Sequence, residues 1–130
     1  MEPLPFGSLA IEEVASIRDD QRIYVRRPDE PNSIRLTMRM KPVGMVEHDK
    51  FDFYATIAAR NFGGSDRSPL GTAMGDIRIG DPVSVEVAGP ALPVGLYRLA
   101  ANVEIYRPGH SAEEPPLYSE GASGDLMRVS

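Results

Sequence analysis

The chain has 130 residues with no cysteine, no tryptophan and two histidines, and its 14 basic and 19 acidic side chains give a formal net charge of −5. The absence of cysteine excludes a disulfide framework, a thiolate metal site, an iron–sulfur cluster and a cysteine nucleophile. A net acidic chain with few aromatic residues also argues against nucleic acid as a partner, because nucleic acid binding rewards a positive surface and stacking platforms.

The length suits one domain spanning residues 1–130. No stretch approaches the roughly 18 consecutive apolar residues of a membrane-spanning helix, so membrane insertion is not expected. Residues 1–6 carry neither a basic segment nor an apolar one of the kind that marks secretion, and a cytoplasmic location is therefore the expectation. The 12 glycines and 12 prolines predict many short elements separated by turns.

The first candidate element covers residues 9–17. Its apolar residues Ile11, Val14 and Ile17 are spaced three apart, and Ser8 stands where a helix N-cap would stand. This pattern fits one or two helical turns, and it also fits an irregular strand. We treat residues 1–21 as a lead-in and residues 22–130 as the main domain.

From residue 22 onward the hydrophobic period changes to two, which is typical of strands with one buried and one wet face. The alternation is clearest over residues 34–40, 51–59, 83–87 and 99–105, and weaker candidates cover residues 23–25, 74–79, 116–119 and 126–129. Glycine, proline and asparagine clusters separate these segments. Seven or eight short strands without intervening helices predict an all-β protein, a single antiparallel β-sandwich.

One local motif refines this prediction. In the segment from Leu92 to Val103 a proline–glycine turn leads into a strand, and Tyr97 shares the inward face of that strand with Leu99. The motif resembles the tyrosine corner of immunoglobulin-like and fibronectin-III-like sandwiches. The resemblance implies that the Tyr97 hydroxyl bonds to backbone a few residues upstream. Leu99 stands where antibody domains carry a cysteine, so the resemblance concerns the superfold and not antibody domains.

A second resemblance rests on the residues Ala55 to Asn61, the pair Gly71 and Thr72, and the segment Leu92 to Leu99. Their order is similar to that in the C-terminal sandwich domains of polysaccharide-exporting ABC transporters. Those domains bind glycan termini, so the resemblance implies glycan binding as an alternative function.

A basic stripe is the first candidate binding site. Alternation places Arg35, Arg39 and Lys41 on one outward face, where they could contact an acidic protein or ligand. The alternative is a solvated face whose charges pair with Asp52 or Glu104 on neighbouring strands.

Three tyrosines are the second candidate site. Tyr54, Tyr106 and Tyr118 are expected to be exposed, two of them on outward strand positions. Tyrosine stacks on sugars and anchors protein interfaces, because it offers a large contact area with few rotatable bonds. Ordinary packing at a sheet edge or under a loop is the alternative.

The best titratable cluster contains His48, Asp49, Lys50 and Asp52. A histidine–carboxylate pair could act as a general base, but no sequence motif for a nucleophile, a metal site or a phosphate loop accompanies it. A solvated loop is the alternative, and neither a metal nor a cofactor is expected.

Taken together, these features favour a non-catalytic module that binds another protein or itself, the latter giving a homo-oligomer. Strand addition at a sheet edge, or a patch of tyrosine and arginine on one sheet, would be the mechanism. A glycan-binding module is the first alternative, and a small enzyme with a histidine–carboxylate site is the second.

Overall fold

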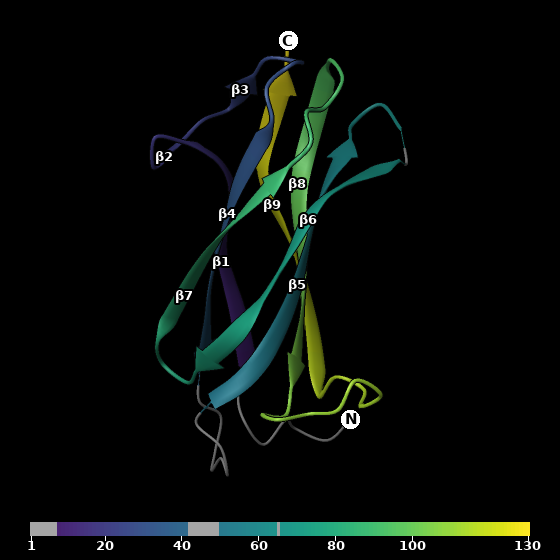
Figure 1. Cartoon of the computed structure of the whole chain (residues 1–130). Helices are drawn as coiled ribbons and strands as arrows, with labels where there is room; N and C mark the ends of the chain where they lie inside the picture. The colour runs from purple at the N-terminus through teal and green to yellow at the C-terminus, as the bar shows by residue number, and fades with distance from the viewer. Residues whose placement is uncertain (1–7, 42–49, 65) are drawn as a thin grey trace.

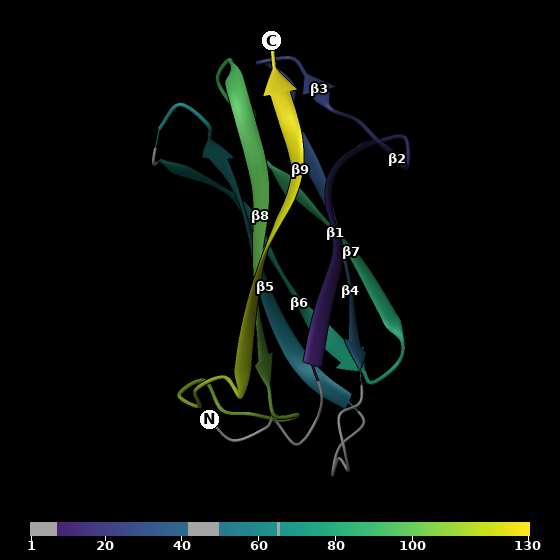
Figure 2. The same cartoon turned by 180° about the vertical axis from the view of Figure 1, so that it is seen from behind.

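The computed structural model describes residues 8–41, 50–64 and 66–130, and within these residues it contains nine β-strands and no helix. They form two sheets packed face to face (Figures 1 and 2). The first sheet has the order β2 (Gln21–Arg22), β1 (Ser8–Arg18), β4 (Asn32–Lys41), β7 (Pro82–Gly89). The second has the order β3 (Val25–Arg26), β9 (Tyr118–Val129), β8 (Gly95–Tyr106), β5 (Lys50–Asn61), β6 (Arg67–Arg78). The predicted all-β sandwich is confirmed.

The core lies between the sheets and consists of the residues that the alternation placed inward. On β4, β5 and β8 every second side chain is buried: Ile34, Leu36, Met38, Met40, Phe51, Phe53, Ala55, Ile57, Leu99, Ala101, Val103 and Ile105. Removing each of the larger side chains from water contributes about 1.5–3 kcal/mol. The intervening side chains face outward, and those of β5 and β8 therefore form an accessible sheet surface.

Residues 8–18 decide one open alternative and correct one predicted boundary. They form strand β1 with a β-bulge, so the irregular strand is confirmed and the helical turns are wrong. Strand β1 pairs with β4 inside the sandwich, so these residues are not a lead-in to it. The β-bulge between Ile11 and Glu13 is the physical reason for the ambiguous pattern. The extra residue brings Ile11 and Val14 onto the same face three positions apart, which imitates the spacing of a helix.

The tyrosine corner is present. The Tyr97 hydroxyl donates a hydrogen bond of 2.8 Å to the carbonyl of Pro93, four residues upstream, as the motif implied. The Tyr97 ring is buried, and Gly95 lies against it closely enough that a Cβ at position 95 would sit 3.3 Å from the ring. The turn between β7 and β8 is thereby fixed to the start of β8.

An arm formed by residues 19–31 crosses from one sheet to the other. It begins with the two-residue β1–β2 turn, in which Asp19 and Asp20 both have positive φ. It then adds β3 to the second sheet, parallel to β9. The Arg26 guanidinium is buried beneath the arm and donates to Ser16 Oγ at 2.8 Å and to the Ile17 carbonyl at 2.6 Å. Arg26 therefore ties the arm to β1.

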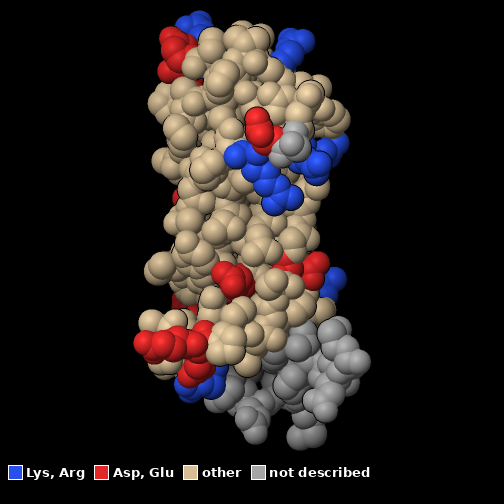
Figure 3. All heavy atoms as spheres, turned by 90° about the vertical axis from the view of Figure 1, so that its right-hand side faces the viewer, with Lys and Arg blue, Asp and Glu red and all other residues tan. Residues whose placement is uncertain are grey.

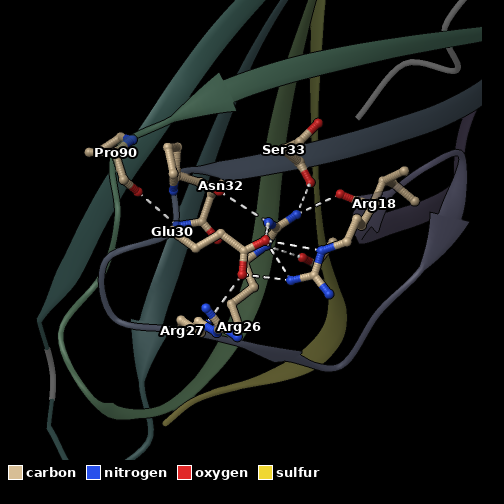
Figure 4. Close-up of polar contacts among 10 residues, drawn as sticks. Arg18, Arg26, Arg27, Glu30, Asn32, Ser33 and Pro90 are labelled. Carbon is tan, nitrogen blue, oxygen red and sulfur yellow. Dashed lines mark hydrogen bonds and ion pairs between the residues drawn. The ribbon is translucent and has the colours of Figure 1, made fainter.

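The end of the arm is held by a network around Glu30 (Figure 4). The Glu30 carboxylate pairs with Arg18 and Arg26, and these bonds, from Arg18 above all, lower its pKa. Burial lowers the pKa of Arg26. The donors and acceptors of this cluster are used within the fold, so we regard it as a structural clamp.

No helix in the described residues has the length and apolar character needed to cross a membrane.

Candidate functional site

The predicted basic stripe lies on β4, and its two arginines are engaged within their own sheet. Arg35 Nε is 2.6 Å from a Glu13 carboxylate oxygen, and Arg35 also pairs with Asp20 at 3.0 Å. Arg39 lies 3.6 Å from Glu12 and donates to the Gly80 carbonyl at 3.1 Å. The stripe is thus a paired, partly solvated surface.

The prediction that the charges of the basic stripe pair with Asp52 or Glu104 is wrong. Asp52 and Glu104 lie on β5 and β8, in the opposite sheet, so they cannot reach Arg35 or Arg39. The sequence could not reveal this, because alternation gives the face of a residue and not the sheet to which its strand belongs. Lys41 ends β4 and is exposed.

The three predicted tyrosines divide between two environments. Tyr54 and Tyr106 lie on the outward positions of β5 and β8 and are half-buried by their neighbours. Tyr118 is not an exposed aromatic: it packs against the core, and its hydroxyl donates to Glu120. Burial raises its pKa to about 12. Because the arginines of β4 and the tyrosines lie on opposite sheets, they do not form a single patch.

The outward surface of β6, β5 and β8 holds the best candidate site. We define this outer face by the outward residues of its three strands: Arg67, Pro69, Thr72, Met74 and Asp76 on β6; Asp52, Tyr54, Thr56, Ala58 and Arg60 on β5; Arg98, Ala100, Asn102, Glu104 and Tyr106 on β8. The register pairs these residues row by row. In particular, Tyr54 stands between Met74 and Glu104, and Asp52 stands between Asp76 and Tyr106.

One end of the outer face is hollowed into an open groove of about 470 Å³. Its lining combines apolar, aromatic and charged side chains: Lys50, Asp52, Phe53, Tyr54, Met74, Gly75, Asp76, Tyr106 and His110. Met74 is a large apolar side chain on the edge strand β6, and it is 73% exposed. An exposed methionine beside two tyrosines is typical of contact surfaces.

A histidine–carboxylate pair closes one side of this groove. His110 Nδ1 lies 3.1 Å from an Asp52 carboxylate oxygen and 3.2 Å from the Arg107 carbonyl. Since the carbonyl can only accept, the proton is placed on Nδ1. The His110 ring stacks on Tyr106 with centroids 4.4 Å apart. These contacts attach the 107–117 loop to the sheet.

The other side of the groove carries an exposed ion pair. Lys50 Nζ lies 2.9 Å from Asp76, and this hydrogen bond lowers the pKa of Asp76. Burial, together with the charge of Glu104, raises the pKa of Tyr106. Asp76 is therefore ionised and Tyr106 is neutral at physiological pH, so the groove presents a carboxylate near a neutral aromatic ring.

The described lining of the groove contains no serine, threonine or cysteine beside His110. The His48 and Asp49 cluster singled out in the sequence lies outside the described residues. Among residues 8–41, 50–64 and 66–130, no group of three or more histidine, aspartate or glutamate side chains is arranged to hold a metal ion.

The opposite end of the outer face is basic. Arg67, Arg60 and Arg98 are direct cross-strand neighbours on β6, β5 and β8. Figure 3 shows a basic cluster with an acidic neighbour in the upper half of the molecule, mainly acidic residues with some basic ones below, and a belt of mostly uncharged residues between them. Arg98 lies over the ring of the exposed Phe62 at 5.6 Å and donates to the Gly124 carbonyl.

The sequence patterns did not indicate Arg60 and Arg67 as candidate binding residues. A signal was available for Arg60, because it continues the even-numbered outward positions of β5 that include Tyr54. Arg67 lies outside every predicted strand, because β6 begins seven residues before the predicted strand at residue 74.

No protein-family model and no curated protein matches this sequence. Among solved structures, a beta-glucosidase from Kluyveromyces marxianus is similar over 93% of this chain, with 9% identity and a TM-score of 0.42. The chain spans 14% of that enzyme. A similarity at this level carries no argument about activity, and the class defined here is that of a two-sheet β-sandwich with a charged and aromatic outer face.

Proposed function

We propose that this chain is a non-catalytic protein-binding module that engages its partner through the outer face. The observation that carries the proposal is the exposure of Met74 beside Tyr54 and Tyr106, with charged side chains around them. Tyrosine and methionine are enriched at the centres of protein interfaces, where a polar rim surrounds them. A surface that served only to solvate the sheet would not need these side chains.

The proposal includes an immunoglobulin-like or fibronectin-III-like classification. Seven long strands follow the succession of such sandwiches, with the first, second and fifth in one sheet and the third, fourth, sixth and seventh in the other. The tyrosine corner at Tyr97 supports the same classification. Sandwiches of this superfold present flat sheet faces and edges that are well suited to protein contacts, although the superfold alone does not define a function.

A cytoplasmic location is also part of the proposal. A chain without cysteine gains nothing from an oxidising compartment, and it is stabilised by its core and by Tyr97 where related extracellular domains use a disulfide.

Site-specific photocrosslinking tests the proposal. Benzoylphenylalanine replaces Met74, which is 73% exposed on the outer face, and Val94 serves as a control because it is 67% exposed in the turn before β8. In cells that naturally produce this chain, we expect a polypeptide to be crosslinked at position 74 and none at position 94. The crosslinked polypeptide can be a second copy or another protein. Equal crosslinking from both positions, or none from position 74, would contradict the proposal.

The groove favours glycan binding as a second candidate. Its volume of about 470 Å³ lies in the range of small-ligand sites, and carboxylates beside tyrosine rings can bind sugar hydroxyls and stack on sugar faces. One face of the Tyr106 ring is covered by His110, so Tyr54 would supply the main stacking surface. Saturable binding on a glycan array that is lost in Tyr54→Ala would support this candidate, whereas an unchanged or empty array would remove it.

A further inference from the structure

The arginine row at one end of the outer face is not neutralised within the fold. Arg67, Arg60 and Arg98 stand directly opposite one another, and like charges in such positions destabilise a sheet. Among the described residues, Arg60 and Arg67 form no ion pair, and the polar contact of Arg98 is with a carbonyl group. The row therefore presents positive charge that folding does not require.

The other end of the outer face carries the carboxylates Asp52, Asp76 and Glu104 at a matching distance. Two of these also have a partner within the fold, His110 for Asp52 and Lys50 for Asp76. On β5, Arg60 lies four residues after Thr56 and Asp52 lies four residues before it. On β8, Arg98 and Tyr106 lie at the same separation from Asn102. At about 3.4 Å per residue, each charged row is ~14 Å from the central row of Thr72, Thr56 and Asn102.

We propose that the outer face binds a second copy of this chain, with a two-fold axis that lies in the plane of the face and runs across the strands along the central row. This inference rests on the proposed function and specifies its partner. The rotation reverses the strand direction and keeps each strand above its counterpart. Arg60 then meets the partner subunit's Asp52, Arg67 meets the partner subunit's Asp76, and Arg98 meets the partner subunit's Tyr106. Each of these contacts occurs twice.

The shapes on either side of the central row are also complementary. The row on the acidic side contains the large residues Met74 and Tyr54, whereas the row on the basic side contains Pro69, Ala58 and Ala100. A shallow hollow of about 410 Å³ lies over these small residues of β5 and β8 and continues onto β9. The same rotation places Tyr54 over the partner subunit's Ala58, so that large side chains enter the hollow of the other copy.

The size of the face predicts a weak dimer. Three strands about 4.8 Å apart and eight residue steps of about 3.4 Å give a contact of roughly 14 by 27 Å, or ~800 Å² counted over both copies. Interfaces below about 1,200 Å² are those of transient complexes. Exposed charge pairs are screened by salt, so the dimer should dissociate further as ionic strength rises.

Sedimentation velocity of the whole chain between about 1 and 500 μM tests the inference. We expect the weight-average mass to rise from 14.2 kDa toward twice that value, and added salt to oppose the rise. The variants Arg67→Asp and Asp76→Arg each place like charges at both ends of the interface, and each should weaken the dimer at least tenfold. Both positions are exposed on an edge strand, so folding is retained.

An equimolar mixture of the two variants provides the decisive comparison. The aspartate introduced at position 67 then meets the arginine introduced at position 76, while the unchanged Arg67 of one chain meets the unchanged Asp76 of the other. The mixture should therefore dimerise as the parent chain does. Arg27→Asp, which makes the same charge change at an exposed position of the arm, should leave dimerisation unaffected.

Three results would overturn the inference: a monomer at all concentrations, a dimer insensitive to both single variants, or a mixture that stays monomeric. The proposed function fails separately. If the chain is monomeric but position 74 crosslinks to a different polypeptide, the outer face binds a protein that is not a second copy. If position 74 crosslinks to nothing, the proposed function itself is wrong.

Discussion

The substitution Glu13→Gln removes a negative charge that lies among three donors on the outside of the four-stranded sheet. Glu13 accepts hydrogen bonds from Arg35 at 2.6 Å, from Arg22 at 2.8 Å and from Thr37 at 3.2 Å. The hydrogen bond from Arg35, and then those from Arg22 and Thr37, lower the pKa of Glu13 from its usual value near 4.5 to about 2, although burial opposes them. The carboxylate is thus more stable in the folded chain than in the unfolded one.

The loss of unfolding free energy expected for Glu13→Gln follows from this pKa difference. At about 1.4 kcal/mol per pKa unit the difference corresponds to roughly 3.5 kcal/mol, which is an upper limit. The side chains of Arg35 and Arg22 are 22% and 41% exposed, and pairs that reach water contribute less than 1 kcal/mol each. We therefore expect Glu13→Gln to lower the free energy of unfolding by about 1–2 kcal/mol at pH 7.

The direction of the pKa shift determines how the stabilisation by Glu13 depends on pH. Because the folded-state pKa is depressed, the stabilisation is fully present above the unfolded-state pKa near 4.5 and is lost as the pH falls toward 2. Urea denaturation of the parent chain and of Glu13→Gln, at several pH values between 7 and 2, should give free energies of unfolding that converge at the acidic end.

The control is Glu12→Gln. Glu12 is the neighbouring residue, with a side chain that is 47% exposed and a single ion pair of 3.6 Å, so its substitution should change stability by less than 0.5 kcal/mol. Equal losses for the two variants at pH 7, or a loss for Glu13→Gln that stays constant down to pH 2, would refute the reasoning.

Three further predictions concern backbone and core. Tyr97→Phe leaves the Pro93 carbonyl without its donor and should cost about 1–2 kcal/mol in chemical denaturation; an unchanged midpoint would mean that the corner is not stabilising. Gly124→Ala would place a Cβ 2.3 Å from the Val14 carbonyl oxygen, and we expect a loss of about 1–3 kcal/mol in thermal unfolding, whereas a neutral result would show that β9 can move away from β1. Asp19→Gly should stabilise the chain by about 0.5 kcal/mol, because glycine adopts φ near 52° without strain and the neighbouring Asp20 keeps its ion pair with Arg35; a lower melting temperature would contradict this.

The sequence predicted the long alternating strands well, because burial of one face imposes a period of two wherever the pairing is regular. It left β1 open between helical turns and an irregular strand for a definite reason. The bulge after Ile11 shifts the phase by one residue, and a single-sequence pattern cannot distinguish this shift from a helical period. The strand is fixed by its pairing with β4, which is a property of the tertiary structure.

A similar limit applies to β9. Residues 116–119 and 126–129 were predicted as two weak strands within a loop-rich region, and the structure joins most of them into one strand from Tyr118 to Val129. Gly121, Ser123 and Gly124 have low strand propensity, but pairing with β8 and a close approach to β1 favour small residues there.

The candidate site was predicted only in part. The outward placement of Tyr54 and Tyr106 could be predicted from parity, whereas their separation from Arg35 and Arg39 depends on which strands share a sheet. The contact between His110 and Asp52 joins positions 58 residues apart, and no local pattern encodes it.

The arrangement of β1 and β9 determines how the domain responds to force. Ser8 lies at the lower end of the sandwich and Ser130 at the upper end, so a pull on these two points acts along the strands (Figure 1). The hydrogen bonds of β1 with β4 and of β9 with β8 run across the strands, and they are then loaded in shear, all at once. A sideways pull on either strand would instead open the bonds one after another, so the domain resists tension along its axis far better than tension across it.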